Sequence, residues 1–172
     1  GRLRSGEVVV PDKIFTFKHT VYFYETNAVS GVVYFSHYVK WQGMVREEFL
    51  IRMVPEWKQV MEASAKGKID MITAEEHSKF MKHSFFGDEI LIKSHVREIK
   101  KFSFEIVFEM TKNGSKDHIY EGWHRLAYSD FDGNFVPIPE PVLRAILEYA
   151  PQEEIKRYKQ RYQTTKEGLV TR

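Results

Sequence analysis

Apolar and polar residues alternate with a period of two along five stretches of the chain. The stretches are residues 14–24, 69–83, 90–96, 102–110 and 119–128. This period is typical of a strand that buries one face, because successive side chains of a strand point to opposite sides. In the first stretch Phe15, Phe17 and Val21 share a face that His19 interrupts. We therefore predict about five strands, of which residues 69–83 form the weakest candidate.

A period close to 3.6 replaces the alternation between residues 34 and 53. The first apolar row consists of Tyr34, Tyr38, Trp41, Val45 and Phe49. A second row, Phe35, Val39 and Leu50, widens the apolar stripe. A helix with so wide a stripe is covered on much of its circumference. We predict that it is the central helix of the domain.

Turn signals and charge define the remaining segments. Asn113-Gly114 separates two alternating runs, which favours a hairpin between them. Pro139 precedes a short predicted helix at residues 140–149, and a polar connection leads from Pro55 toward the second strand candidate. The order is strand, long helix, then about four antiparallel strands and a terminal helix. One antiparallel sheet wrapped round one helix, an α+β arrangement, satisfies this order.

Length and composition fit one packed domain. The chain has 172 residues, of which 42% are hydrophobic and 15% are aromatic, enough for one ordinary core. We expect a single domain over 1–172, with a core at about 14–149 and a charged, frayed tail at 150–172. The absence of cysteine excludes disulfides, thiolate metal sites and cysteine nucleophiles, and it fits a reducing compartment.

Charge and hydropathy exclude two further classes of protein. Lys and Arg number 26 against 24 Asp and Glu, so the chain lacks the positive field of a dedicated nucleic-acid binder. No apolar run approaches the roughly 20 residues that span a bilayer, and the N-terminal segment lacks the apolar core of a signal peptide. We expect a soluble, cytoplasmic protein without a nucleic-acid or membrane partner. The histidines show no spacing of metal ligands, so we predict no metal and no cofactor.

Arg46 is the residue whose setting raises a question of function. Its helical neighbours at three and four residues are Gln42, Gly43, Phe49 and Leu50, and none is acidic. An unpaired buried charge costs several kcal/mol, on the order of 3 to 5. Arg46 therefore either extends to solvent, pairs with a carboxylate distant in sequence, or binds a ligand. The helix alone leaves these alternatives open.

The loop before the long helix is a second candidate for chemistry. Residues 27–31 lead into the helix start, where backbone N–H groups and the helix dipole can stabilise an oxyanion. Asn27 stands at the beginning of this loop. Asn27 and Ser30 also fit the simpler role of turn or capping residues. Local sequence does not separate the two interpretations.

Residues 21–50 resemble the N-terminal signature of hotdog-fold thioesterases of the 4-hydroxybenzoyl-CoA thioesterase type. The pattern is most similar to the branch that serves enediyne and polyene polyketide synthases. The matching residues are Glu25-Thr26-Asn27, Val33-Tyr34, Tyr38, Trp41-Gln42-Gly43 and Arg46-Glu47. The strand order from Ile69 onward and Pro137-Ile138-Pro139 extend the likeness to about residues 14–149. The resemblance implies a single hotdog domain, with an antiparallel sheet wrapped round one long central helix.

The resemblance also implies a thioesterase without a catalytic carboxylate. The general family places an aspartate where this chain has Asn27, and asparagine cannot ionise. Asn27 and Arg46 would then orient the thioester and water. The substrate-binding residues implied are Gly31, Val33, Tyr34, Tyr38, Trp41 and Gln42. Other bases that we considered, His37, His83 and Glu48, fit structural or solvated roles better.

The implied substrate is a polyene or β-ketoacyl thioester on the phosphopantetheine of an acyl carrier protein, or on CoA. Hydrolysis of a β-ketoacyl thioester gives an acid prone to decarboxylation. We expect a homodimer with a continuous sheet, pairing again into a homotetramer, with the active site between one copy's helix start and the other's strands. Two alternatives stay open. One is a general acyl-CoA or acyl-carrier thioesterase, and the other is a non-catalytic hotdog domain that binds an acyl chain.

Overall fold

The computed structural model describes residues 5–6, 8–9, 14–162, 164–165 and 168–169. Most of the N-terminal segment inspected for a signal peptide lies outside the described residues. Parts of the predicted tail, namely 163, 166–167 and 170–172, also lie outside them.

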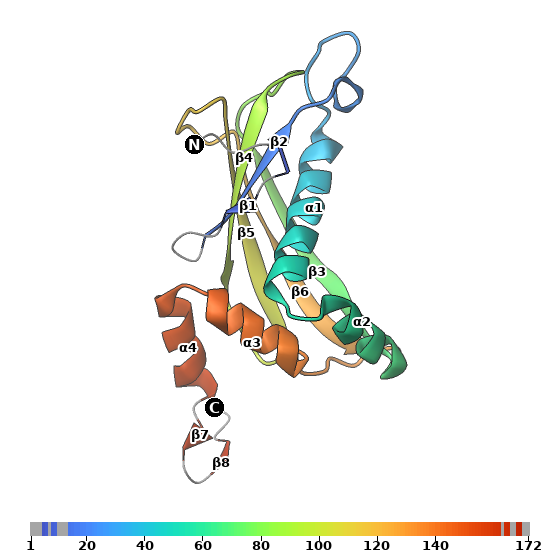
Figure 1. The fold of residues 1–172 in the computed structure, drawn as a ribbon, viewed down its shortest axis with the longest axis vertical. Helices are drawn as coiled ribbons and strands as arrows, with labels where there is room; N and C mark the ends of the chain where they lie inside the picture. Colours follow the sequence, from blue (N-terminus) through green and yellow to red (C-terminus); the bar gives the residue numbers. More distant parts are fainter. Residues whose placement is uncertain (1–4, 7, 10–13, 163, 166–167, 170–172) are drawn as a thin grey trace.

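An antiparallel sheet forms the body of the molecule (Figure 1). Its strands are β1 Val8–Val9, β2 Phe15–Thr20, β3 Ile69–Phe80, β4 Glu89–Arg97, β5 Ser103–Lys112 and β6 Tyr120–Asp130. They are ordered β1-β2-β4-β5-β6-β3, and every neighbouring pair is antiparallel. The five predicted strands are therefore confirmed. The first is shorter than predicted, because the chain leaves the sheet after Thr20 and forms the 3-10 turn η1, Phe23–Glu25.

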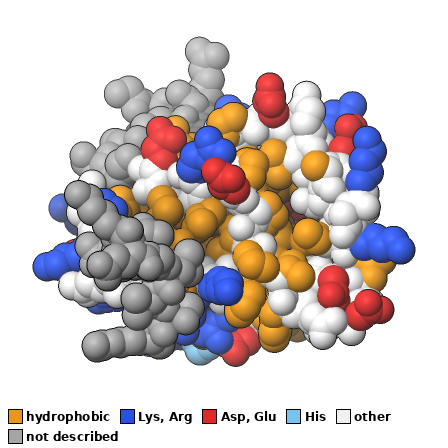
Figure 2. Space-filling model, turned by 90° about the horizontal axis from the view of Figure 1, so that it is seen from below, with side chains coloured by type: hydrophobic (Ala, Val, Ile, Leu, Met, Phe, Trp, Pro, Cys, Tyr) orange, Lys and Arg blue, Asp and Glu red, His pale blue; other side chains and the backbone are white. Residues whose placement is uncertain are grey.

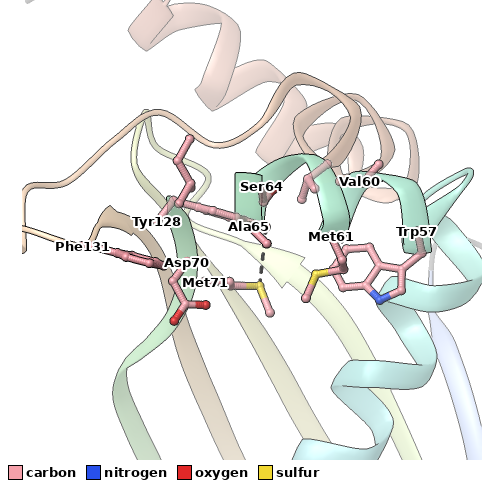
Figure 3. Close-up of a pocket in the computed structure, with 11 residues that line it drawn as sticks. Trp57, Val60, Met61, Ser64, Ala65, Asp70, Met71, Tyr128 and Phe131 are labelled. Atoms are coloured by element: carbon pink, nitrogen blue, oxygen red, sulfur yellow. Dashed lines mark hydrogen bonds between the residues drawn. The ribbon is translucent and has the colours of Figure 1, made fainter. Parts of the chain in front are cut away.

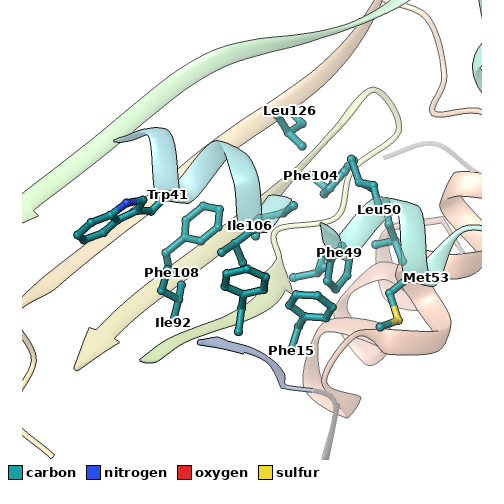
Figure 4. Close-up of a cluster of buried hydrophobic side chains, with 14 of the residues drawn as sticks. Phe15, Trp41, Phe49, Leu50, Met53, Ile92, Phe104, Ile106, Phe108 and Leu126 are labelled. Carbon is teal, nitrogen blue, oxygen red and sulfur yellow. The ribbon is translucent and has the colours of Figure 1, made fainter. Parts of the chain in front are cut away.

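The long helix α1, Phe35–Met53, begins one residue later than predicted and ends at the predicted residue. It runs along the sheet in Figure 1, and its first apolar row is buried from Tyr38 to Phe49. Phe104, Ile106 and Phe108 of β5 are fully buried in the hydrophobic cluster (Figure 4), and Met110 of the same strand is also fully buried. At the N-terminal end of the helix, the first residue of each apolar row is not buried: Tyr34 is 54% exposed and Phe35 is 56% exposed. This is the predicted α+β hotdog arrangement.

Helix α2, Trp57–Lys66, was not predicted. Its segment was interpreted as a polar connection, although Trp57, Val60, Met61 and Ser64 follow the helical spacing i, i+3, i+4 and i+7. No residue of α2 is fully buried. Its apolar face therefore lies over the sheet without being packed as tightly as that of α1.

Two helices close the C-terminal side of the core. Helix α3, Glu140–Tyr149, has the predicted bounds. Helix α4, Gln152–Tyr162, replaces part of the tail that we expected to be frayed. The carboxylate of its buried Glu154 accepts a hydrogen bond from the Glu98 backbone at 3.0 Å, which anchors α4 beside the end of β4. The short strands β7, Thr164–Thr165, and β8, Gly168–Leu169, pair with each other.

Strand β3 forms one edge of the sheet. Eleven of its twelve residues pair with β6, with an irregularity between Thr73 and Glu75, and in the described chain no strand lies on its other side. A long edge with unpaired N–H and C=O groups is a template for another strand. None of the helices in the described ranges is long and apolar enough to cross a membrane.

Candidate functional site

The loop before α1 is closed by its own hydrogen bonds. The Oδ1 atom of Asn27 accepts from the Val29 backbone at 3.1 Å, and the Asn27 carbonyl accepts from the Gly31 backbone at 2.7 Å. Gly31 has a φ of 71°, a left-handed conformation that glycine adopts without strain. Asn27 therefore serves as a turn residue here, with its side chain at the surface. Its predicted catalytic role is compatible with this position but not required by it.

A cavity of about 360 Å³ lies between the helix start and the end of β3. It is lined by Val32, Val33, Phe35, Tyr38, Phe80, Met81, Lys82 and His83. Two predicted substrate-binding residues, Val33 and Tyr38, lie in this lining, whereas Tyr34 is exposed outside it and Gly31 lies in the loop above. The Tyr34 side chain makes no capping hydrogen bond at the N-terminus of α1, and the N–H of His37 donates to the Tyr34 carbonyl at 3.0 Å.

Glu25 connects the strand, the 3-10 turn and the helix. Its buried carboxylate accepts from Trp41 Nε1 at 2.7 Å, from the Tyr22 backbone at 2.8 Å and from His19 Nε2 at 2.9 Å. Burial by itself raises the pKa of Glu25, but these hydrogen bonds outweigh it and hold the pKa below 4.5. The predicted substrate-binding role of Trp41 is therefore less direct, since its indole is 2% exposed and bonded inside the core. Sequence reasoning missed this group, although His19 on an apolar strand face was a signal of it.

Arg46 extends toward the edge strand. Its Nη1 donates to Thr73 Oγ1 at 2.9 Å, and within the described ranges no carboxylate lies within ion-pair distance of the guanidinium. The helix has no acidic neighbour for Arg46, and among the described residues the tertiary structure brings no carboxylate to it either. From Phe35 to Arg46 the helix rises about 16 Å. The structure therefore does not bring Asn27 and Arg46 together within one chain.

Gln42 and His124 form a buried polar pair between α1 and β6. The Gln42 side chain is fully buried, and its Oε1 accepts from His124 Nε2 at 2.7 Å. Gly122 makes room for the amide, since a Cβ there would lie 2.3 Å from Gln42 Nε2 and 2.4 Å from the His77 carbonyl. Burial, together with the positive charge of Arg46, lowers the pKa of His124 to about 4. The imidazole is therefore neutral at pH 7.

Neither Gly122 nor His124 was predicted to belong to a site. Both occupy inward positions of β6, in the sequence Tyr120, Gly122, His124, Leu126, where a strand would otherwise place large apolar residues. That break in the apolar alternation is the signal that sequence reasoning had available. Gln42, by contrast, was predicted as substrate-binding, and the structure places it inside the core rather than in a cavity.

The alternative bases have other contacts. Glu48 accepts from Arg52 Nε at 3.0 Å, and the ring of His37 packs against Tyr24 at 6.0 Å between centroids. His83 lines the cavity at the helix start, and its carbonyl accepts from Lys112 Nζ at 2.7 Å. Within the described residues, no group of three or more His, Cys, Asp or Glu side chains is arranged to hold a metal ion.

A second cavity, of about 200 Å³, lies at the opposite end of β3, under α2. Figure 3 shows side chains of α2, among them Val60 and Met61, facing Met71 and Tyr128 across it. The Tyr128 hydroxyl donates to Met71 Sδ at 3.5 Å. Hydrophobic side chains gather across the middle of the face seen from this end (Figure 2). This apolar cavity contains none of the predicted site residues.

The sequence matches a family model, described as the thioesterase-like superfamily, over residues 21–146. This match covers well over half of the chain. The chain belongs to the thioesterase-like superfamily. Its matched region includes both candidate residues of the loop and helix, Asn27 and Arg46. A search of curated protein sequences found no significant match.

Solved structures of several thioesterases share the fold of this chain. The dynemicin thioesterase, whose crystal structures report polyene binding, is 28% identical with a TM-score of 0.66, over 78% of this chain and 96% of that one. A gentisyl-coenzyme A thioesterase is 25% identical with a TM-score of 0.64, over 76% and 98% of the two chains. A 1,4-dihydroxy-2-naphthoyl-CoA thioesterase from Synechocystis is 19% identical with a TM-score of 0.69, over 77% and 95%. The last likeness shows the fold alone.

Proposed function

We propose that this superfamily member hydrolyses an acyl thioester carried by the acyl carrier protein of a polyketide synthase. The observation that carries the proposal is Arg46, a guanidinium beside the edge strand with no carboxylate in ion-pair distance among the described residues. The likeness to the polyene-binding dynemicin thioesterase supports a polyene or β-ketoacyl substrate. The cavity at the start of α1 offers an apolar surface for such a chain.

The reaction needs polarisation of the carbonyl more than a strong base. Water adds to the thioester carbonyl carbon, the C–S bond breaks, and the thiol leaves with a proton. Arg46 and the N–H groups of the helix start stabilise the negative charge that develops on the carbonyl oxygen. Asn27 orients the thioester and water. A β-keto acid released in this way then loses CO2 to give a ketone.

Joint action of Asn27 and Arg46 requires a second copy of the chain. Asn27 lies in the loop before α1, whereas Arg46 lies about 16 Å along the helix from its first residue and donates to Thr73 on the unpaired edge strand. Pairing of β3 with β3 of a second copy would continue the sheet and bring that copy's helix start toward this edge. We propose a homodimer of this kind, with the site shared between copies, and further pairing into a tetramer.

A general acyl-CoA thioesterase is the second candidate, favoured by the 25% identity to a gentisyl-coenzyme A thioesterase. A panel of acyl-CoA esters of increasing length and a β-ketoacyl or polyenoyl carrier protein would be tested by following thiol release. We expect turnover of the carrier-bound polyenoyl or β-ketoacyl substrate to exceed that of simple acyl-CoAs. Broad turnover of simple acyl-CoAs would favour the second candidate. Folded protein that releases no acid, ketone or polyene would instead indicate a non-catalytic acyl-binding domain.

A further inference from the structure

A polar cluster lies buried where α1 crosses the sheet. It is formed by Gln42 and His124, and Arg46 lies one helical turn after Gln42. Two hydrogen bonds fix the orientation of the Gln42 amide: its Nε2 donates to the His77 carbonyl at 3.5 Å, and its Oε1 accepts from His124 Nε2 at 2.7 Å. Because Gly122 has no side chain, the amide approaches the backbone of the sheet closely. The cluster is part of the core, although its members are polar.

These contacts determine the tautomer of His124. A backbone carbonyl can only accept a hydrogen bond, so the amide nitrogen of Gln42 faces His77 and its oxygen faces the imidazole. The Nε2 atom of His124 therefore carries the proton. The other ring nitrogen, Nδ1, is then a bare acceptor, and it is buried without a hydrogen-bond partner among the described residues.

Arg46 carries the complementary group, a donor without a partner in the described ranges. Its Nε–H is a donor that is also buried without a hydrogen-bond partner in the described part of the chain. Arg46 follows Gln42, the partner of His124, by one helical turn. It donates to Thr73, which pairs with Leu126 two residues from His124. The side chains of Arg46 and His124 are therefore neighbours between α1 and the β3–β6 pair. Leaving a buried donor and a buried acceptor unsatisfied is unfavourable, and one group that both accepts and donates would satisfy both.

We propose that a buried water molecule bridges Arg46 Nε–H and His124 Nδ1, which makes His124 a positioning residue for Arg46. The bridging group is water rather than a substrate oxygen, because both nitrogen atoms are shielded from solvent. With Thr73 accepting from Nη1 and the water accepting from Nε–H, the guanidinium is fixed at two points. This inference rests on the proposed role of Arg46 in thioester hydrolysis, although the water site itself does not.

Two substitutions of His124 separate its two ring nitrogens. His124→Asn places a carboxamide oxygen near the position of Nδ1 and loses the contact to Gln42, whereas His124→Gln keeps a donor toward Gln42 and loses the Nδ1 acceptor. We expect His124→Gln to lower kcat about tenfold with little change in KM, since a water-mediated bond to a charged group is lost, and His124→Asn to stay within about twofold of wild type. The substrate is the acyl thioester that the wild-type enzyme turns over fastest. Equal losses, or a larger loss in His124→Asn, would overturn the proposal.

A measurement on the unmodified protein tests the water site without any assay of activity. In ¹⁵N spectra of the histidine side chains we expect His124 as the Nε2–H tautomer at pH 7, and in a high-resolution crystal structure an ordered water between Nδ1 and Arg46 Nε. An Nδ1–H tautomer, or a direct contact between the two nitrogens with no water, would refute the inference. If the protein hydrolyses no thioester, the proposed function fails, and these two measurements still decide the water site.

Discussion

Arg46 and Arg52 lie on the same helix and differ in their partners. Arg52 forms an exposed ion pair with Glu48 at 3.0 Å, whereas Arg46 binds only the Thr73 hydroxyl among the described residues. We predict that Arg46→Ala lowers kcat/KM by about 10² to 10³, because a donor to a developing oxyanion is lost. Arg46→Lys should recover little, since a point charge does not replace a planar fork. Arg52→Ala, the matched control, should leave turnover nearly unchanged.

Thiol release and melting temperature would be measured on the same samples of these variants. A structural role for Arg46 predicts the opposite pattern: a lower melting temperature, with unchanged activity in the protein that remains folded.

His124 gives the stability of the protein a defined pH dependence. Its pKa is lowered from 6.5 to about 4 in the folded state, so between these values the unfolded chain binds more protons than the folded one. The free energy of unfolding should therefore fall as the pH decreases from 6.5 to 4, by on the order of 3 kcal/mol from this residue. Urea unfolding of wild type and His124→Asn at several pH values would isolate this contribution. The same acid sensitivity in both proteins would contradict it.

At the scale of elements, the packing of α1 on β6 depends on Gly122. We predict that Gly122→Ala destabilises the fold by about 1 to 3 kcal/mol or more, because the added Cβ meets the Gln42 amide and the His77 carbonyl. Gly43 provides a matched control on α1, since nothing lies within 4 Å of a Cβ built there. Gly43→Ala should stabilise the helix by roughly 0.5 to 1 kcal/mol. The free energy of unfolding of both variants would be measured by chemical denaturation. Equal effects of the two substitutions would contradict the close approach of the Gln42 amide to Gly122.

At the scale of the whole molecule, the unpaired edge of β3 predicts association. We expect sedimentation at micromolar concentration to give at least twice the mass of one chain, because a twelve-residue edge strand is exposed. A monomeric mass would exclude both the proposed dimer and a site shared between copies.

Mixing two inactive variants tests the shared site directly. If Asn27 of one copy and Arg46 of the other serve one thioester, a heterodimer of Asn27→Ala with Arg46→Ala contains one intact site and one doubly substituted site. We predict that subunit exchange between the two variants restores activity, up to about half of the wild-type value per heterodimer. Failure to restore activity, with exchange confirmed by mass, would place both residues in the same copy's site or outside it.

The chain's periodicity was sufficient for most of its elements. Strict alternation gave β4, β5 and β6, a wide helical stripe gave α1, and Pro139 marked the start of α3. These features are local, since the pattern of burial repeats within each segment. Helix α2 was missed because its apolar positions are few and separated by charged residues. Helix α4 was missed because charge was interpreted as fraying, although Glu154 and Tyr162 bind the backbone near the end of β4.

The sequence by itself determined that Arg46 has no acidic neighbour on its helix, and that the loop at Asn27 leads into the start of that helix. Only the tertiary structure decided what surrounds them. Thr73 and His124 come from strands remote in sequence, and their approach to Arg46 depends on sheet register and helix position rather than on any local pattern. The separation of Asn27 from Arg46 was decided in the same way, because the helix rises by about 16 Å between its start, beside the Asn27 loop, and Arg46.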